Sequence, residues 1–155
     1  MVETVGIVGA GQMGSGIAHV LALHGFKVVL VDIDQGGLDR GLESISRNLE
    51  RQVAKDAITT ADKDAALALI TTGADYGVLS GCDLVIEAVT EDEAAKCAVY
   101  EKLTPNLGPD TILATNTSSI SITRLAAASG RPGKFMGMHF MNPVPVMTMF
   151  SGFRS

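Results

Sequence analysis

The stretch TVGIVGAGQMG, residues 4–14, decides the fold of this chain. Its first five residues form a short apolar run rich in β-branched side chains, which is typical of a buried parallel strand. The glycines of a GxGxxG pattern follow at Gly9, Gly11 and Gly14, and apolar residues then recur at helical spacing. A second strand-like segment, KVVLV, occupies residues 27–31. Strand, glycine turn, helix and strand in this order predict a right-handed βαβ unit.

The remainder of the chain alternates helical and strand-like patterns. The pattern predicts helices from Ser15 to Gly25 and over residues 35–56, 61–69, 93–107 and 120–128, and strands over residues 70–72, 83–89, 111–114 and 134–140. Strands that alternate with helices form parallel sheets covered on both faces. The expected fold is therefore α/β with a doubly wound, mainly parallel sheet, that is, a Rossmann-type dinucleotide-binding domain. A chain of 155 residues with 46% apolar side chains suits one such domain.

The position of the glycine pattern favours binding of a dinucleotide. Gly9 permits a tight turn, Gly11 lets the backbone approach a pyrophosphate, and Gly14 lets the helix pack closely on the strand. The helix N-terminus then offers N–H groups to the phosphates. Asp32 follows the second strand, 18 residues after Gly14, where a carboxylate accepts hydrogen bonds from ribose hydroxyls and repels a 2′-phosphate. We therefore expect NAD rather than NADP, the alternative being that Asp32 is a plain loop carboxylate.

The composition excludes several other classes of protein. The chain has 12 basic and 17 acidic residues, a net charge of -5, and no Lys/Arg cluster that would suggest a nucleic-acid partner. Polar side chains interrupt the N-terminal apolar run and no Lys or Arg precedes Lys27, so neither a signal peptide nor a membrane span is expected. Cys82 and Cys97 have no metal-like spacing, which indicates free thiols in a reducing compartment and no metal site. The prediction is a cytoplasmic protein.

Polar side chains follow several of the predicted strands. Ligands of open α/β sheets bind outside the carboxyl ends of the strands. The residues at these ends are Glu91, Asn116, Ser118, His139 and Asn142. Oxidation of an alcohol by NAD needs a base for the hydroxyl proton, and histidine suits this role because its pKa lies near physiological pH. Two alternatives stay open: His139 as a buried structural histidine, and Ser118 as the cap of the helix that follows it.

Four segments resemble the NAD-binding domain of L-3-hydroxyacyl-CoA dehydrogenases, including the 3-hydroxybutyryl-CoA members. They are GAGQMGSGIA at residues 9–18, DLVIEAV at 83–89, TNTSS at 115–119 and HFMNPVPVM at 139–147. They occur in the order of the family, and the last two are far more specific than the glycine pattern. The resemblance spans about residues 3–147.

The resemblance implies catalytic roles for particular residues. His139 matches the catalytic histidine of the family, and Glu91 matches the glutamate that pairs with it. Ser118 matches the serine that contacts the substrate oxygen and the nicotinamide, and Asn142 matches the asparagine beside them.

Further roles concern the cofactor and coenzyme A. Together with the glycine pattern, the matches make up a cofactor-binding set of Gly9, Gly11, Gln12, Met13, Gly14, Asp32, Glu91, Lys96, Asn116, Ser118 and Asn142. Lys55 matches a lysine that contacts the phosphates of coenzyme A, and Arg51 would share its helix face. The alternative for this pair is solvated surface charge.

The implied activity is the NAD-dependent oxidation of L-3-hydroxyacyl-CoA to 3-ketoacyl-CoA, or the reverse reduction, in fatty-acid or short-chain acyl-CoA metabolism. The sequence departs from the family after residue 147. There the family continues into a strand and a helical second domain, which provides the dimer interface and part of the acyl-CoA site. In this chain residues 148–155 are TMFSGFRS, and the glycine in this segment is unsuited to a strand interior. We expect an NAD-binding domain over residues 1–147, an atypical truncated tail, self-association into a homo-oligomer, and turnover that is absent or severely reduced.

Two other functions are alternatives. The first is a non-catalytic NAD-binding remnant or a crystallin-like structural protein, which the missing second domain favours. The second is a dehydrogenase of the 6-phosphogluconate or 3-hydroxyisobutyrate type, which shares the glycine opening but resembles this chain less around residues 116–119 and 139–145.

Overall fold

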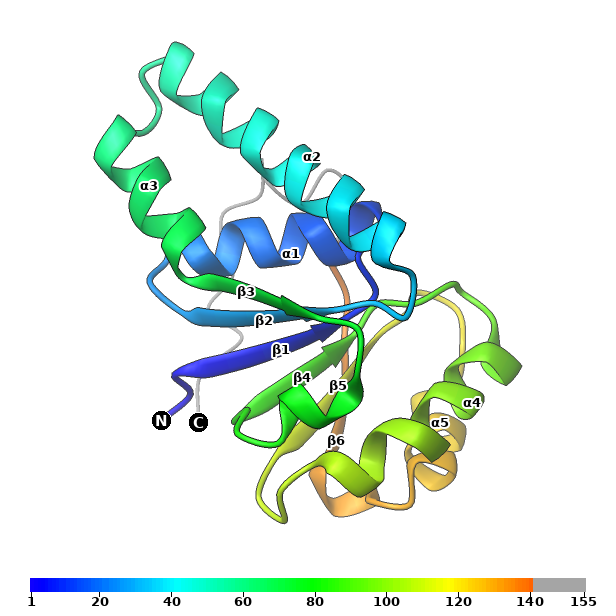
Figure 1. Ribbon diagram of the computed structural model, residues 1–155. Coiled ribbons are helices and arrows are strands. Elements are labelled where there is room, and N and C mark those ends of the chain that lie inside the picture. Colours follow the sequence, from blue (N-terminus) through cyan, green and yellow to red (C-terminus); the bar gives the residue numbers. More distant parts are fainter. Residues whose placement is uncertain (141–155) are drawn as a thin grey trace.

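The computed structural model describes residues 1–140 and contains a sheet of six strands (Figure 1). The strands are β1 (Thr4–Val8), β2 (Lys27–Val31), β3 (Ile70–Gly73), β4 (Leu84–Glu87), β5 (Ile112–Asn116) and β6 (Phe135–Met138). They lie in the order β3-β2-β1-β4-β5-β6, and every neighbouring pair is parallel. The structure therefore confirms the predicted α/β class with a Rossmann-like parallel sheet.

Helices cover both faces of this sheet (Figure 1). One face carries α1 (Gln12–Leu23), α2 (Gln35–Ala54) and α3 (Thr60–Ala68), and the other carries α4 (Glu93–Leu103) and α5 (Ile122–Ser129). No helix in the described part of the chain is long and apolar enough to cross a membrane. Alternate residues of a strand point to opposite faces, so Val5 and Ile7 pack beneath α1–α3 whereas Val8 packs in the core beneath α4 and α5. Because both faces are covered, β4 is buried along its whole length.

Side-chain caps mark the starts of four helices. A first-turn backbone N–H donates to the side chain of the cap residue in α2, α3, α4 and α5, the caps being Asp34, Thr59, Asp92 and Ser121. The suggestion that Ser118 caps the helix after it was wrong. The helix begins only at Ile122, and the Ser121 hydroxyl accepts the Arg124 N–H at 3.4 Å.

The end of α4 also differs from the prediction. The helix was expected to continue to residue 107, but it ends at Leu103 and a short 3₁₀ turn over Thr104–Asn106 follows. Pro105 lies in this turn, and proline has no N–H with which to continue an α-helical ladder.

The start of α2 lies directly against the glycine turn. A Cβ on Gly41 would come within 2.8 Å of the Ala10 carbonyl oxygen, so only glycine permits this approach. Farther along α2, the Gln52 Oε1 lies 2.7 Å from Nε2 of His19, a residue of α1 that is 1% exposed. Burial lowers the pKa of His19, which keeps its ring neutral near neutral pH. These contacts hold α2 in place as one wall of the candidate site.

Candidate functional site

The turn between β1 and α1 forms the first part of the site. Gly9 has a φ of 105°, and a Cβ on Gly14 would meet the Gly9 carbonyl oxygen at 1.7 Å, so both positions require glycine. At Gly11, in contrast, a Cβ would meet no described atom within 4 Å, and the turn is open to a ligand there. Among the described residues no side chain caps α1 at Gly11. The first N–H groups of α1, including those of Gln12 and Met13, and the positive end of its dipole thus fit a pyrophosphate.

Asp32 lies beside this turn, directly after β2. Its Oδ2 accepts the Ala10 N–H at 2.9 Å, and its Oδ1 accepts the Asp34 N–H at 2.9 Å. The two hydrogen bonds fix the carboxylate between the glycine turn and the start of α2. This position suits a ribose whose phosphate lies at the N-terminus of α1.

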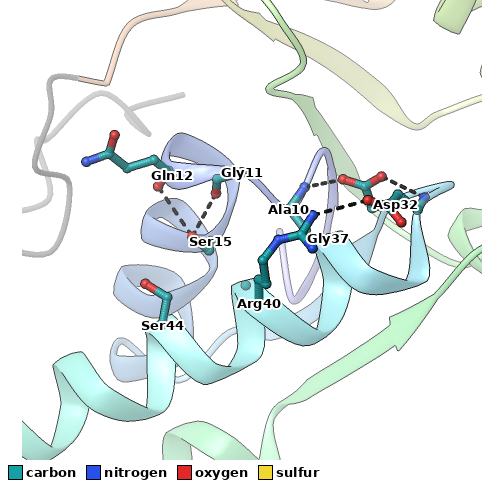
Figure 2. A pocket seen from close by; sticks show the side chains of 10 residues that line it. Ala10, Gly11, Gln12, Ser15, Asp32, Gly37, Arg40 and Ser44 are labelled. Atoms are coloured by element: carbon teal, nitrogen blue, oxygen red, sulfur yellow. Dashed lines mark hydrogen bonds and ion pairs between the residues drawn. The ribbon is translucent and has the colours of Figure 1, made fainter.

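Two hollows adjoin Asp32 and Gly11, which line both of them. The first has a volume of about 390 Å³ and lies between the glycine turn and α2, where its polar lining includes Gln12, Ser15, Arg40 and Ser44 (Figure 2). The second also has a volume of about 390 Å³ and is largely apolar, with a lining that includes Ile33, Tyr76, Val89 and Val99. Ile33 is 77% exposed, so an apolar surface is available at the side of Asp32 where the flat face of an adenine would fit.

A buried carboxylate organises the neighbouring part of the sheet. Glu87, at the end of β4, is 0% exposed. Its oxygens accept hydrogen bonds from the Val89 N–H at 2.9 Å, Lys96 Nζ at 2.7 Å, the Tyr100 hydroxyl at 2.8 Å and the Thr115 hydroxyl at 2.7 Å. Burial, with the nearby Glu87 charge, raises the pKa of Tyr100, so its hydroxyl stays protonated as a donor.

Glu87 and Tyr100 are not among the functional residues expected from the sequence. The available signal was a charged residue within the apolar run of residues 83–89, because a buried carboxylate needs partners. The sequence did not indicate which residues supply them.

Lys96 connects this carboxylate to the edge of the sheet where His139 lies. Its side chain is fully buried, and Nζ donates to the backbone carbonyl of Asn116 at 3.1 Å as well as to Glu87. The Asn116 side-chain oxygen in turn accepts the Phe140 N–H at 3.1 Å. Lys96 and Asn116 thus support the ends of β4, β5 and β6. Direct contact of either residue with the cofactor stays a prediction.

The loops after β4 and β5 are joined through Glu91. Its carboxylate accepts a hydrogen bond from the Thr117 hydroxyl and, at 3.3 Å, from the Ser118 N–H. These bonds hold the turn on which Ser118 is exposed. Thr117 is a further residue for which the sequence predicted no role.

His139 directly follows β6 and is exposed in the described structure, so these residues do not bury it. The Thr117 N–H donates to the Met138 carbonyl at 3.4 Å. Ser118 directly follows Thr117 and His139 directly follows Met138, so this hydrogen bond joins the two chain segments that carry them. Within residues 1–140 no hydrogen bond or ion pair joins Glu91 to His139, and their pairing stays a prediction. Asn142 lies outside the described residues.

Lys55 and Arg51 lie at the other end of α2. Both are exposed, and Arg51 donates to Asn48 Oδ1 at 3.1 Å. Gly41 of α2 lies against the glycine turn, and with a rise of about 1.5 Å per residue Arg51 and Lys55 lie roughly 15–20 Å farther along the helix axis. The structure does not bring this pair to the edge that carries His139, and its contact with coenzyme A stays a prediction.

Comparisons with known proteins agree with this geometry. The family profile described as "3-hydroxyacyl-CoA dehydrogenase, NAD binding domain" matches residues 4–150. The chain is 50% identical over 149 residues to a 3-hydroxybutyryl-CoA dehydrogenase of Bradyrhizobium diazoefficiens, covering 96% of this chain and 51% of that protein. It is 40% identical over 148 residues to a 3-hydroxyadipyl-CoA dehydrogenase of Escherichia coli, covering 96% of this chain and 31% of that protein.

Solved structures show the same relationship. The (S)-3-hydroxybutyryl-CoA dehydrogenase PaaH1 from Ralstonia eutropha is similar with a TM-score of 0.92 and 46% identity, covering 95% of this chain and 52% of that one. The chain therefore spans about half the length of the 3-hydroxybutyryl-CoA dehydrogenases that it matches.

Proposed function

This chain belongs to the 3-hydroxyacyl-CoA dehydrogenase family, of which it carries the NAD-binding domain, and we propose that it serves the oxidation of L-3-hydroxyacyl-CoA to 3-ketoacyl-CoA or the reverse reduction. The observation that carries the proposal is the contact from the Thr117 N–H to the Met138 carbonyl. It brings together the ends of β5 and β6, after which Ser118 and His139 follow. The dinucleotide cradle lies at the carboxyl end of β1 in the same parallel sheet.

Each side chain has a distinct part in the proposed reaction. When bound, NAD supplies the acceptor for the hydride that leaves the carbon bearing the hydroxyl group. His139 accepts the hydroxyl proton and returns it in the reverse direction. Ser118 donates a hydrogen bond to the substrate oxygen and orients it towards His139. Glu91 holds the turn that presents Ser118 and stabilises the imidazolium, and Asn142 orients the nicotinamide amide.

We propose a short-chain 3-hydroxyacyl-CoA as the substrate. The relatives named above are dehydrogenases of 3-hydroxybutyryl-CoA and 3-hydroxyadipyl-CoA. Arg51 lies in the last turn of α2 and Lys55 directly follows the helix, so that two exposed cations four residues apart can meet the phosphates of coenzyme A. We further propose a homo-oligomer as the working form.

The proposed location is the cytoplasm. Cys82 and Cys97 are both free. Burial, with the nearby Asp83 charge, raises the pKa of Cys82 to about 11, which keeps it as a thiol rather than a reactive thiolate. Two unpaired thiols suit a reducing compartment.

Reduction of acetoacetyl-CoA by NADH tests the proposed function. We expect the 155-residue chain to bind NADH but to turn over little, whereas a chimaera in which it replaces the matching half of the Ralstonia eutropha enzyme should be active. The reason is that the other half of that enzyme is expected to complete the acyl-CoA site. A folded chimaera that binds NADH without reducing acetoacetyl-CoA would instead support a non-catalytic NAD-binding protein. Robust turnover by the purified chain alone would contradict the expected dependence on the second half.

The preference for NADH over NADPH is expected to depend on Asp32. Its carboxylate is expected to accept hydrogen bonds from the ribose hydroxyls and to repel a 2′-phosphate. Asp32→Ala should therefore weaken NADH binding by about tenfold or more and reduce the difference in affinity between NADH and NADPH. Calorimetric titration of both cofactors measures the effect. Asp39→Ala, which removes an exposed carboxylate of α2 outside both hollows, is the matched control. Equal affinities of the unsubstituted chain for NADH and NADPH would rule out this role.

A further inference from the structure

Two carboxylates converge at the first turn of α2. Asp32 Oδ2 and Asp34 Oδ2 lie 3.5 Å and 3.3 Å from the position that a Cβ on Gly37 would occupy. Both residues line the polar hollow between the glycine turn and α2. Only the first of them was expected to bear on the choice of cofactor.

Arg40 meets these carboxylates from within α2. Its Nη2 donates to Asp34 Oδ2 at 3.2 Å. Figure 2 shows its side chain extending from α2 towards the end of the hollow where Asp32 lies. Among the described residues that line this hollow, Arg40 is the only strongly basic one. Together, two carboxylates and one guanidinium give the lining of this hollow a net negative charge, at the place where a ribose bound to Asp32 would lie.

We propose that Asp34 is a second determinant of the preference for NAD over NADP, acting through Arg40. An arginine near the ribose is the group with which dinucleotide-binding domains accommodate a 2′-phosphate. Here Arg40 lines the hollow beside Asp32, but it forms an ion pair with Asp34. The Asp34 carboxylate also carries a negative charge that would repel the 2′-phosphate. The hollow thus has an arginine suited to a 2′-phosphate, but the negative charges of Asp32 and Asp34 disfavour phosphate binding there. This inference rests on NAD binding by the chain and not on its catalytic activity.

Asp34 has a structural role that can be separated from this one. Its side chain accepts the Gly36 N–H at 3.1 Å and caps α2. Serine caps helices about as well as aspartate but carries no charge. Asp34→Ser therefore keeps the cap while it releases Arg40.

The test compares Asp32→Ser with Asp32→Ser/Asp34→Ser. Relative to Asp32→Ser, we expect the added Asp34→Ser substitution to tighten NADPH binding by about tenfold, which corresponds to about 1.4 kcal/mol, and to change NADH binding much less. Adding Arg40→Ala should return NADPH affinity to within about twofold of the Asp32→Ser value. Because Arg40 and Asp34 are largely exposed, the gain should also shrink as salt rises. The chain has no tryptophan, so calorimetry or the fluorescence of the reduced nicotinamide measures binding.

Two further variants keep the test decisive. Asp32→Ser/Asp39→Ser removes the same total charge but leaves the Asp34–Arg40 pair intact, so it should not tighten NADPH comparably. Asp34→Ser alone, with Asp32 retained, should improve NADPH binding only modestly, because the Asp32 carboxylate still repels the 2′-phosphate. An equal gain from Asp39→Ser, or a gain that survives Arg40→Ala, would overturn the role of Asp34. NADH binding by the unsubstituted chain separately tests the cofactor assignment.

Discussion

Replacement of Lys96 by methionine is expected to lower the free energy of unfolding by about 3–5 kcal/mol, because it leaves the Glu87 carboxylate buried without its counterion. Both side chains are 0% exposed, and Nζ lies 2.7 Å from Glu87 Oε2. Val89, Tyr100 and Thr115 would still donate to Glu87, but none of them carries a positive charge. Chemical denaturation followed by circular dichroism measures the loss.

Two comparisons separate this effect from a general loss of charge. Arg47→Met removes an exposed partner of Glu43, whose oxygen lies 3.5 Å away, and should cost less than about 0.5 kcal/mol. Glu87→Gln combined with Lys96→Met should be more stable than Lys96→Met alone, because an amide is cheaper to bury than an uncompensated carboxylate. A loss below about 1 kcal/mol for Lys96→Met would show that the pair is not the main support of this edge.

His139→Gln in the active chimaera is expected to reduce turnover by about 10²–10⁴-fold, the range that general acid–base catalysis contributes. Glutamine can form hydrogen bonds but cannot take up the hydroxyl proton. The glycine turn and Asp32 follow β1 and β2, whereas His139 follows β6, and two strands, β4 and β5, lie between β1 and β6 in the sheet. NADH affinity should therefore stay within about twofold. Steady-state rates with acetoacetyl-CoA and titration with NADH measure the two effects.

The control for this prediction is another histidine. His24 lies at the end of α1, where its ring nitrogen is 2.8 Å from the Val20 carbonyl oxygen, and His24→Gln should leave turnover nearly unchanged. A loss of less than about threefold for His139→Gln would argue against a proton-transfer role. A large loss of NADH affinity would indicate a structural role instead.

The sequence alone determined the opening βαβ unit and the position of Asp32. β1 and β2 have the predicted bounds, since apolar periodicity and a glycine turn act between neighbouring residues. Gly25, with a φ of 89°, follows α1 where a helix end was predicted. The contact of Asp32 with Ala10 could also be anticipated, because a right-handed crossover places the end of the second strand beside the turn after the first.

Only the tertiary structure decided the sheet order and the partners of the buried and loop carboxylates. β4 returns to lie beside β1, and Glu87 receives donors that are 9 and 28 residues away, on α4 and β5. A local rule allowed Ser118 as a helix cap, but the bonds from Thr117 and Ser118 to Glu91 form a turn that leaves this role to Ser121. A buried or looped polar group is stable only where other elements bring its partners within hydrogen-bond distance, and that proximity arises from packing rather than from neighbouring residues.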